Sequence, residues 1–249
     1  MKLTLITATY NSRGVIKDCL NSVTEQDYFD KEHLIIDGNS VDETLAILNR
    51  YQSKNPKIRV VSEPDLGIYD ALNKGVRLAN GDILGFVHSD DLLAQPDVLS
   101  KIMRCFQQNE IDGVFGDLIY VDKNNSSKNL RCWKSCDFDR KLLFRGWMPA
   151  HPTLFLRKEV YQKHGSFNLN YKIASDYDFM LRILKDPALK FVYLPEVITK
   201  MRMGGASNRS FKNLVQKSHE DYRILKSNNF SFPVLTLFLK NISKISQFF

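Results

Sequence analysis

Residues 82–93 read Asp-Ile-Leu-Gly-Phe-Val-His-Ser-Asp-Asp-Leu-Leu, and this stretch indicates the fold class. Its apolar run, residues 83–87, has the length and composition of a buried strand in a parallel sheet. The run leads into two adjacent carboxylates, Asp90 and Asp91. Parallel sheets bind ligands beyond the carboxyl ends of their strands, where a divalent cation bridging to phosphate would neutralise such a pair. Taken alone, the stretch is equally compatible with a solvated loop or with an Asp that caps the next helix.

Three strand–helix units precede this stretch. Each strand is a short apolar run, and each following helix carries apolar residues at helical spacing. This alternation predicts an α/β fold with a Rossmann-like, mainly parallel sheet flanked by helices. Asn11, Asp37 and Asp65 follow the three strands, and we expect them to line one edge of the sheet together with Asp90 and Asp91. The predicted strands are residues 3–8, 33–36 and 58–61, and the helices lie near residues 15–23, 42–48 and 67–78.

The pattern beyond Asp91 is mixed. It contains an alternating strand and a hairpin as well as helices, so the second half of the sheet is not expected to be purely parallel. No linker rich in Pro, Gly or Ser and no internal repeat separates it from the first half. We therefore predict one domain with a mixed second half, followed by C-terminal helices. The predicted elements are a helix from Pro96, strands at 113–121, 130–133 and 153–156, and a helix that opens at 174–178.

Charge is distributed unevenly along the 249 residues. Hydrophobic residues make up 43% and charged residues 25% of the chain, as in globular proteins. The whole net charge of +7 comes from residues 200–249, which contain nine Lys or Arg and two acidic residues. A basic tail on a neutral domain favours an anionic partner surface. We find no signal peptide and no run of the roughly 20 apolar residues that a spanning helix needs.

Several well-known motifs are absent from the sequence. There is no Gly-x-Gly-x-x-Gly after the first strand and no phosphate-binding Gly-x-x-x-x-Gly-Lys. The Gly-x-Ser-x-Gly elbow and the His-Glu-x-x-His zinc motif are also missing. These absences argue against NAD-dependent dehydrogenases, P-loop NTPases, α/β-hydrolases and zinc proteases.

An ordered set of motifs follows the predicted strands. It comprises Thr9-Tyr10-Asn11, Ile36-Asp37-Gly38-Asn39-Ser40, a run over residues 63–75, His88-Ser89-Asp90-Asp91 and Ser175-Asp176-Tyr177-Asp178. In this order and spacing the set resembles the family 2 glycosyltransferases, in particular those of bacterial polysaccharide synthesis, over roughly residues 1–205. The resemblance implies a GT-A fold and a metal-dependent, inverting, hexosyltransferase-like enzyme. Its donor would be a UDP-, GDP- or dTDP-sugar, and its acceptor a glycan, expected to be lipid-linked, in cell-surface polysaccharide synthesis.

The resemblance also implies roles on the donor side. Thr9 and Asp37 would contact the nucleoside, and Asn11 would belong to the same donor-binding set. Asp65 would lie near the base, and Asp90 near the ribose and the diphosphate. Residues 1–93 would thus form the nucleotide-sugar half of the catalytic domain and residues 94–205 the acceptor half.

Two further aspartates would serve the metal and the acceptor. The usual Asp-x-Asp triplet is here Ser89-Asp90-Asp91, so the resemblance makes Asp91 the ligand of Mg²⁺ or Mn²⁺. Asp176 matches the general base of the family, although Ser175 replaces the Glu that usually precedes it. Such a base would take a proton from the acceptor hydroxyl. The alternative for Asp176 is an N-cap of the helix that follows it.

Four other residues belong to the set. His151 would contact the acceptor or the leaving phosphate, or else it is a hydrogen-bonded structural histidine. We expect His88 to point to the opposite face from Ser89 and to be structural. Arg202 and Ser207 resemble a flexible loop near the donor diphosphate, in which Arg202 would contact a phosphate.

Residues 206–249 are predicted to form a basic, amphipathic helical tail. One helix begins near residue 211, and Pro233 opens a second apolar and basic stretch. This tail favours contact with an anionic membrane surface, which would place a cytoplasmic enzyme on the inner face of the cell membrane. The alternative is that both helices pack on the catalytic domain.

Two rival functions were weighed against a glycosyltransferase. A sugar-phosphate nucleotidyltransferase would need a Gly-rich, basic loop after the first strand, which residues 9–13 do not provide. A non-catalytic nucleotide-sugar or nucleic-acid binding module is allowed by charge alone. Aromatic and basic residues interleave only in the tail, so we expect no nucleic-acid partner.

Overall fold

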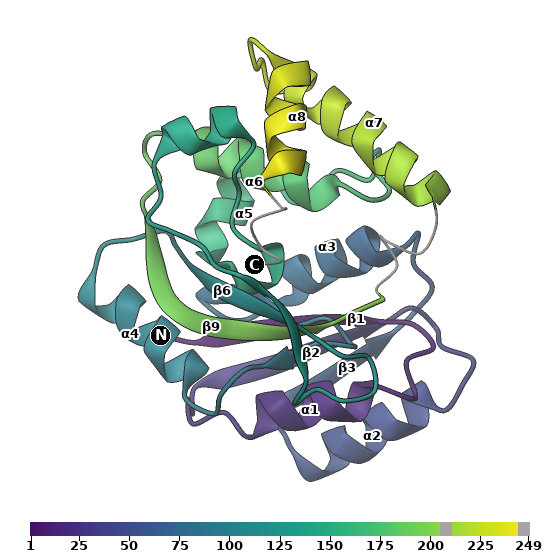
Figure 1. Ribbon diagram of the computed structural model, residues 1–249. Coiled ribbons are helices and arrows are strands. Elements are labelled where there is room, and N and C mark those ends of the chain that lie inside the picture. The colour runs from purple at the N-terminus through teal and green to yellow at the C-terminus, as the bar shows by residue number, and fades with distance from the viewer. Residues whose placement is uncertain (205–210, 244–249) are drawn as a thin grey trace.

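The computed structural model of this protein describes residues 1–204 and 211–243, except for the side chains of residues 211 and 212. Within these ranges a nine-stranded sheet has the order β3-β2-β1-β4-β8-β6-β9-β5, and β7 pairs with β6 (Figure 1). The strands are β1 Leu3–Thr9, β2 Lys31–Asp37, β3 Ile58–Ser62, β4 Ile83–Phe86, β5 Leu92–Leu93, β6 Gly113–Val121, β7 Asn129–Trp133, β8 Phe155–Arg157 and β9 Phe191–Arg202. The helices are α1 Ile16–Thr24, α2 Thr44–Lys54, α3 Ile68–Leu78, α4 Val98–Gln108, α5 Lys158–His164, α6 Ser175–Lys185, α7 Phe211–Ser227 and α8 Pro233–Ile242, with 3₁₀ turns η1 Arg140–Arg145 and η2 His151–Thr153.

The first four strands are parallel, as predicted. Strand β1 pairs with β2 and β4, and β2 pairs with β3, all in parallel register. Every residue of β1 and of β4 is buried, because both faces of the sheet carry a hydrophobic core. One core includes residues of α1, α2 and α4, and the other includes residues of α3, α5, α6 and α7. The carboxyl ends of these strands therefore form an edge between two helical layers (Figure 1).

The second half of the sheet is mixed, again as predicted, but two of its strands were missed. Strand β8 lies antiparallel to both β4 and β6, while β9 runs parallel to β6. The two-residue strand β5 pairs antiparallel with Thr199 and Lys200 near the end of β9. Neither β5 nor β9 was predicted. Their pairing fixes the chain directly after Asp91 against the last residues of β9.

Two sequence expectations are wrong in detail. Residues 153–156 were expected to be a strand, but η2 occupies residues 151–153 and β8 begins at Phe155. The Thr153 N–H donates to the Ala150 carbonyl at 2.9 Å and closes the 3₁₀ turn, and the Thr153 hydroxyl donates to the same carbonyl at 2.8 Å. Strand β6 was expected to alternate between exposed and buried residues, yet eight of its nine residues are buried. It is an interior strand with β8 and β9 on its two sides.

Helices α7 and α8 pack on the outer side of the α6 layer, at the top of Figure 1. Ile224 and Leu225 of α7 are buried in the core that α6 also lines. A Cβ on Gly146, which ends η1, would lie 2.7 Å from the Thr236 carbonyl oxygen of α8, so only glycine allows this close approach. Packing on the domain, which the sequence left as an alternative, is therefore observed for both helices. Among the described residues no helix is long and apolar enough to cross a membrane.

Candidate active site

The carboxyl ends of β1, β2 and β3 form the first part of the site. Thr9 pairs with Asp37, and Asp37 pairs with Ser62, in the parallel register. The Asp37 carboxylate is buried and accepts hydrogen bonds on both oxygens. The Ser62 hydroxyl donates to Oδ2 at 2.6 Å, and the Ser40 hydroxyl donates to Oδ1 at 2.5 Å. The loop after β2 and the last residue of β3 thus hold this carboxylate in one orientation.

Asn11 and Asp65 join the same edge. Asn11 adopts a left-handed backbone (φ 50°), and its N–H donates to the Ser40 hydroxyl at 2.9 Å. A Cβ on Gly38 would lie 2.5 Å from Asp65 Oδ2, so the absence of a side chain there lets the loop after β3 come close. The structure thus brings together Thr9, Asn11, Asp37 and Asp65. Their contacts with a nucleoside stay predictions.

Asp91 lies after β4, directly before β5, and is only 1% exposed. Its Oδ1 accepts a hydrogen bond from the Arg202 backbone N–H at 3.3 Å. Burial, and then the neighbouring charge of Asp90, raise the pKa of Asp91 well above its ordinary value. A cation at this carboxylate would favour the ionised form, because it would compensate both effects.

A site of this kind is compatible with a divalent metal. Residues 1–204 and 211–243 contain no group of three or more His, Cys, Asp or Glu side chains arranged to hold an ion. Mg²⁺ is commonly held by one or two carboxylates plus the phosphates of a substrate, so a larger protein cage is not required. The hard oxygen donors of Asp90 and Asp91 fit that pattern, and the charge of Arg202 offsets only part of the rise in the pKa of Asp91.

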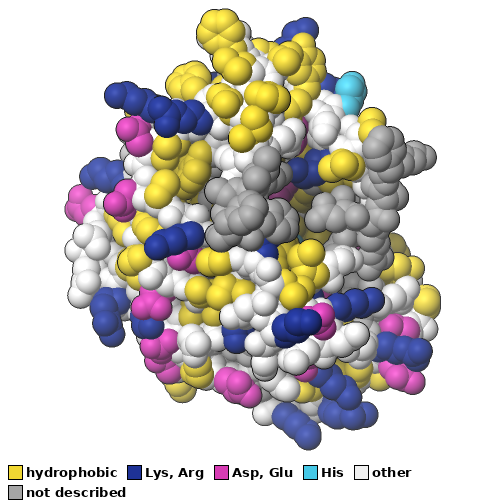
Figure 2. Space-filling view, viewed as in Figure 1, with side chains coloured by type: hydrophobic (Ala, Val, Ile, Leu, Met, Phe, Trp, Pro, Cys, Tyr) yellow, Lys and Arg dark blue, Asp and Glu magenta, His cyan; other side chains and the backbone are white. Residues whose placement is uncertain are grey.

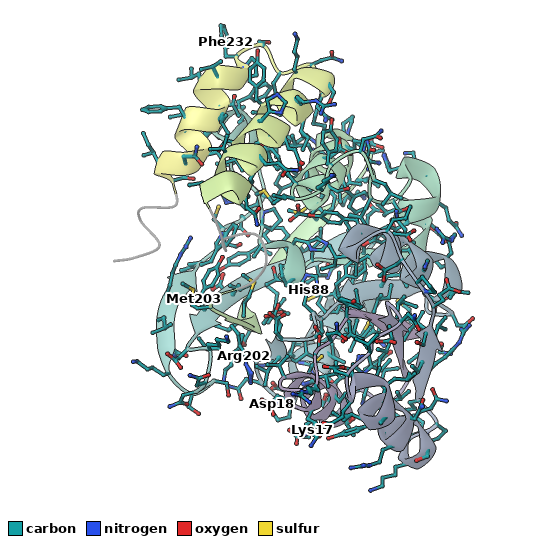
Figure 3. All side chains as sticks on the ribbon, turned by 90° about the vertical axis from the view of Figure 1, so that its right-hand side faces the viewer. Lys17, Asp18, His88, Arg202, Met203 and Phe232 are labelled. Atoms are coloured by element: carbon teal, nitrogen blue, oxygen red, sulfur yellow. The ribbon has the colours of Figure 1, made fainter. Side chains whose placement is uncertain are left out.

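The Arg202 guanidinium points to Asp18 on α1 (Figure 3). Arg202 is almost buried at the end of β9, whereas the Asp18 side chain is 52% exposed. The ion pair therefore joins the last residue of β9 to the first turn of α1, on the side of the site where Asp91 lies. A phosphate contact by Arg202 stays a prediction. Ser207 lies outside the described residues.

Asp176 sits in the first turn of α6, as expected from the sequence. Tyr69 Oη of α3 lies 3.1 Å from Asp176 Oδ1 and 2.7 Å from the Ile173 carbonyl oxygen. The single phenol proton can be donated to either acceptor. Burial, followed by the charge of Asp176, raises the pKa of Tyr69 well above its ordinary value, so this phenol stays protonated. Asp176 makes no side-chain cap at the helix N-terminus, where Ala174 is the cap residue.

His88 and His151 lie between the two groups of aspartates. Their ring centroids are 6.0 Å apart, and His151 stacks on Phe86 at 5.2 Å. Burial lowers the pKa of His88, and the nearby charges of Asp90 and Asp176 act in the opposite direction. Burial likewise lowers the pKa of His151 to about 4, against the charge of Asp176. Both rings are therefore neutral at pH 7, and His88 lies within electrostatic reach of both Asp90 and Asp176, whereas His151 is close to Asp176 alone.

Comparison with known proteins identifies the family of this chain. The model for glycosyl transferase family 2 matches residues 4–165. A PGL/p-HBAD biosynthesis glycosyltransferase of Mycobacterium tuberculosis is 34% identical over 206 residues, which cover 82% of this chain and 78% of that protein. The chain belongs to glycosyltransferase family 2.

Solved structures confirm the predicted GT-A fold of this glycosyltransferase. Residues 1–349 of Staphylococcus aureus TarS, in complex with UDP-GlcNAc, give a TM-score of 0.70 at 19% identity, covering 94% of this chain and 73% of that one. A longer TarS chain is matched over only 39% of its length. A mannosyltransferase from Pyrobaculum calidifontis, in complex with GDP-Man and Mn²⁺, gives 0.64 at 18% identity, covering 98% and 75%. At these identities the likeness is one of fold.

Sequence reasoning missed several partners of the site residues in this glycosyltransferase. Tyr69 lies in a quoted motif, but its contact with Asp176 spans 107 positions. Ser62 contacts Asp37 over 25 positions, and the Arg202 side chain reaches Asp18 over 184 positions. For Ser62 the sequence did offer a signal, because its hydroxyl directly follows the predicted strand 58–61. The other two contacts had no such signal.

Proposed function

We propose that this glycosyltransferase moves a sugar from a nucleotide-diphosphate sugar to a hydroxyl of a lipid-linked glycan with inversion at the anomeric carbon. The observation that carries the proposal is the placement of Asp176 beside the donor edge. The charges of both Asp90 and Asp176 act on the single buried ring of His88. His88 is thus within electrostatic reach of both Asp90 and Asp176, which supports a base at Asp176 close to the donor edge.

The proposed reaction is a single displacement. The acceptor oxygen forms a bond to the anomeric carbon while the bond from that carbon to the diphosphate oxygen breaks. The nucleoside diphosphate leaves with the electron pair, and the Asp176 carboxylate takes the proton of the acceptor hydroxyl. The Tyr69 phenol keeps Asp176 oriented, because it stays protonated and lies 3.1 Å from Oδ1. One base and no covalent nucleophile are sufficient, and such a displacement inverts the configuration.

Asp91, with Asp90 beside it, would hold Mg²⁺ or Mn²⁺. When bound, the ion would offset the negative charge that develops on the leaving diphosphate. Thr9, Asn11, Asp37 and Asp65 would bind the nucleoside side of the donor. Structural relatives with UDP-GlcNAc and with GDP-Man and Mn²⁺ support a donor of this class and a metal of this type.

A donor panel tests this proposal. UDP-, GDP- and dTDP-sugars would be added with and without Mn²⁺ while thermal unfolding is followed. We expect one nucleotide class to raise the Tm in the presence of metal, by a ligand-linkage effect that grows with concentration. Product configuration would be read from the anomeric coupling in NMR. Retention of configuration, or transfer that survives both Asp91→Asn and Asp176→Asn, would contradict the proposal.

We further propose that the enzyme works at the inner face of the cell membrane and acts on cell-surface polysaccharide precursors. Residues 1–205 would carry catalysis, and the tail, residues 206–249, would contact the membrane. Helix α8 and its cap residue expose large apolar side chains, including Phe238 (60% exposed) and Phe232 (70%). Figure 2 shows hydrophobic side chains gathered at the top of the molecule, with basic side chains at the edges of this patch. Apolar area next to basic charge is typical of interfacial helices.

Vesicle sedimentation tests the membrane contact without disturbing the packed face of α8. Phe238→Ser removes an exposed ring (60%), and Phe29→Ser removes a still more exposed ring (80%) between α1 and β2 as a control. We expect Phe238→Ser alone to lower the bound fraction on vesicles that contain anionic lipid. Equal binding of both variants, or binding that does not depend on anionic lipid, would contradict it.

A further inference from the structure

The carboxylate of Glu220, in the middle of α7, contacts the chain just before α6. Its Oε2 accepts the backbone N–H groups of Ile173 at 2.9 Å and of Ala174 at 3.0 Å. Its Oε1 accepts the N–H of Lys172 at 3.1 Å. One side chain therefore satisfies three consecutive donors that directly precede the turn bearing Asp176.

Ala174, the cap residue of α6, contributes one of these three donors, and Lys172 and Ile173 directly precede it. Helix α6 lacks a side-chain cap, because its cap residue is Ala174. Unpaired N–H groups at a helix N-terminus are normally satisfied by a neighbouring Ser, Thr, Asp or Asn, and a carboxylate there also interacts favourably with the helix dipole. In this protein a helix that starts after the catalytic region supplies the carboxylate, over 46 to 48 positions of sequence.

The peptide at Ile173 is held from both sides. Its N–H donates to Glu220, and its carbonyl lies 2.7 Å from the Tyr69 hydroxyl. That hydroxyl is also the group beside Asp176 Oδ1. A shift of this segment would therefore move both acceptors of the Tyr69 proton, which are Asp176 Oδ1 and the Ile173 carbonyl oxygen.

Glu220 is itself held firmly. It is buried, and Gln216, one turn earlier, donates to Oε1 at 3.0 Å. Burial alone would raise the pKa of Glu220, but the donors from Ile173, Gln216, Lys172 and Ala174 outweigh it and hold that pKa below its ordinary value. The carboxylate is thus ionised at neutral pH.

The neighbouring residue fixes α7 to its surroundings. Asp221 forms a buried ion pair with Lys240 of α8 at 2.8 Å. The Lys240 ammonium also lies 3.1 Å from the ring centre of Tyr177, the residue after Asp176. Helix α8 therefore contacts the first turn of α6, and α7 contacts the segment that directly precedes it.

We propose that Glu220 is a positioning residue for Asp176, so that the C-terminal helices are part of the catalytic machinery. The inference rests on the proposed role of Asp176 as the base. Glu220 contacts no substrate in this account. It fixes the first turn of α6, and through the Ile173 peptide it fixes the partner of Tyr69.

The test compares two truncations in the same helix, measured well below the Tm of each variant. Glu220→Ala removes the acceptor of the three N–H groups, and Ile224→Ala opens a cavity one turn later while leaving that carboxylate in place. We expect Glu220→Ala to lower kcat about tenfold to a hundredfold, because small misplacements of a reacting group have effects of this size. Its donor KM should stay within about twofold, since the donor edge is untouched. Ile224→Ala should keep kcat.

Glu220→Gln preserves size and one carbonyl acceptor, so it should recover part of the lost kcat and remains informative if Glu220→Ala does not fold. Equal kcat losses in Glu220→Ala and Ile224→Ala would show general loosening and overturn the proposal. Wild-type kcat in Glu220→Gln would overturn it as well. Asp176→Asn, measured in parallel, separates the two ideas. If Asp176→Asn keeps full activity, the proposed base is wrong, whereas an inactive Asp176→Asn beside a fully active Glu220→Gln refutes only the positioning role.

Discussion

The donor edge and the base end of this enzyme are built in opposite ways. At the donor edge, Asp37 is held by Ser40, three residues later, and by Ser62 on the adjacent strand. At the base end, Asp176 depends on Tyr69, 107 positions earlier, and its segment depends on Glu220 of a later helix. One carboxylate is positioned by neighbouring segments of a single sheet edge, and the other by helices that meet only in the folded protein. A change at the donor edge should therefore alter binding, and a change at the base end should alter turnover.

The strongest test of this division is Asp176→Asn. The amide keeps the size of the side chain but cannot take a proton, so kcat should fall by about 10²- to 10⁴-fold. The Tm increase caused by donor and Mn²⁺ should persist, because the donor edge is intact. Steady-state kinetics and thermal unfolding of the same preparation measure both quantities. Loss of the donor effect together with activity would show that the two ends are not separable.

Asp91→Asn should give the next largest effect, this time on metal and donor together. Metal assistance supplies several kcal/mol of charge stabilisation, so transfer should fall by about a hundredfold or more. The Mn²⁺-dependent increase in Tm with donor should disappear. Asp91→Glu, which keeps a carboxylate, is the matched variant, and recovery of metal dependence there would support a direct ligand. Unchanged Mn²⁺ dependence in Asp91→Asn would place the metal elsewhere.

Asp91→Asn should also change how the stability of the protein depends on pH when metal and donor are absent. A raised pKa means that the folded state binds the Asp91 proton more tightly than the unfolded state does. The resulting stability is present at acid pH and is lost as pH rises through the folded pKa. Asp91→Asn should therefore be more stable than the wild type at neutral pH, by on the order of 1 kcal/mol or about 2–4 °C in Tm for a chain of this size, and the difference should vanish near pH 3. A difference that does not change with pH would show that ionisation of Asp91 is not its cause.

The contrast between the two ends also explains what the sequence could predict. Strands β1 to β4 follow from short apolar runs and the polar residues after them, and both signals are local. Strand β9 was missed because Pro195 interrupts it, and proline is rare inside strands. In the structure the register of β9 against β6 jumps from Tyr193 to Val197, so Pro195 lies in a bulge. Strand β5 has only two residues and exists because β9 is there to pair with it.

The candidate site shows the same limit. Asp90, Asp91 and Asp176 could be predicted from the sequence because each lies in a recognisable motif. Asp90 and Asp91 follow a strand, and Asp176 lies in the first turn of a helix. The sequence analysis treated Glu220 only as one of two acidic residues in a basic tail. Nothing in the sequence of residues 206–249 indicates which backbone N–H groups donate to its carboxylate. Hydrogen bonds across 46 to 48 positions depend on how helices dock, and helical periodicity specifies only which face is buried.

Asp37→Asn should have a moderate effect that is confined to binding. The substitution turns one acceptor of the buried carboxylate into a donor, which conflicts with the hydroxyls of Ser40 and Ser62 and typically costs about 1–3 kcal/mol. We expect the donor KM to rise about tenfold while kcat at saturating donor stays within about threefold. Ser62→Ala is the milder control, because it removes one hydrogen bond and keeps the carboxylate. A fall in kcat with unchanged KM would break the proposed division.

The smallest effect is expected at Asp18, where the donor edge meets the end of β9. The Arg202 guanidinium pairs with Asp18, a half-exposed carboxylate, and pairs of this kind contribute only about 0–1 kcal/mol. If Arg202 contacts the donor diphosphate, that diphosphate must compete with Asp18 for it. Asp18→Asn should then lower the donor KM by up to about fivefold, with a fall in Tm of no more than a few degrees. Asp27→Asn, an acidic residue beyond the end of α1 that pairs with Ser100 instead, controls for the loss of negative charge. A higher donor KM in Asp18→Asn would mean that Asp18 orients Arg202 for the donor. Equal KM changes in Asp18→Asn and Asp27→Asn would show that the loss of one negative charge, and not the ion pair, causes the change.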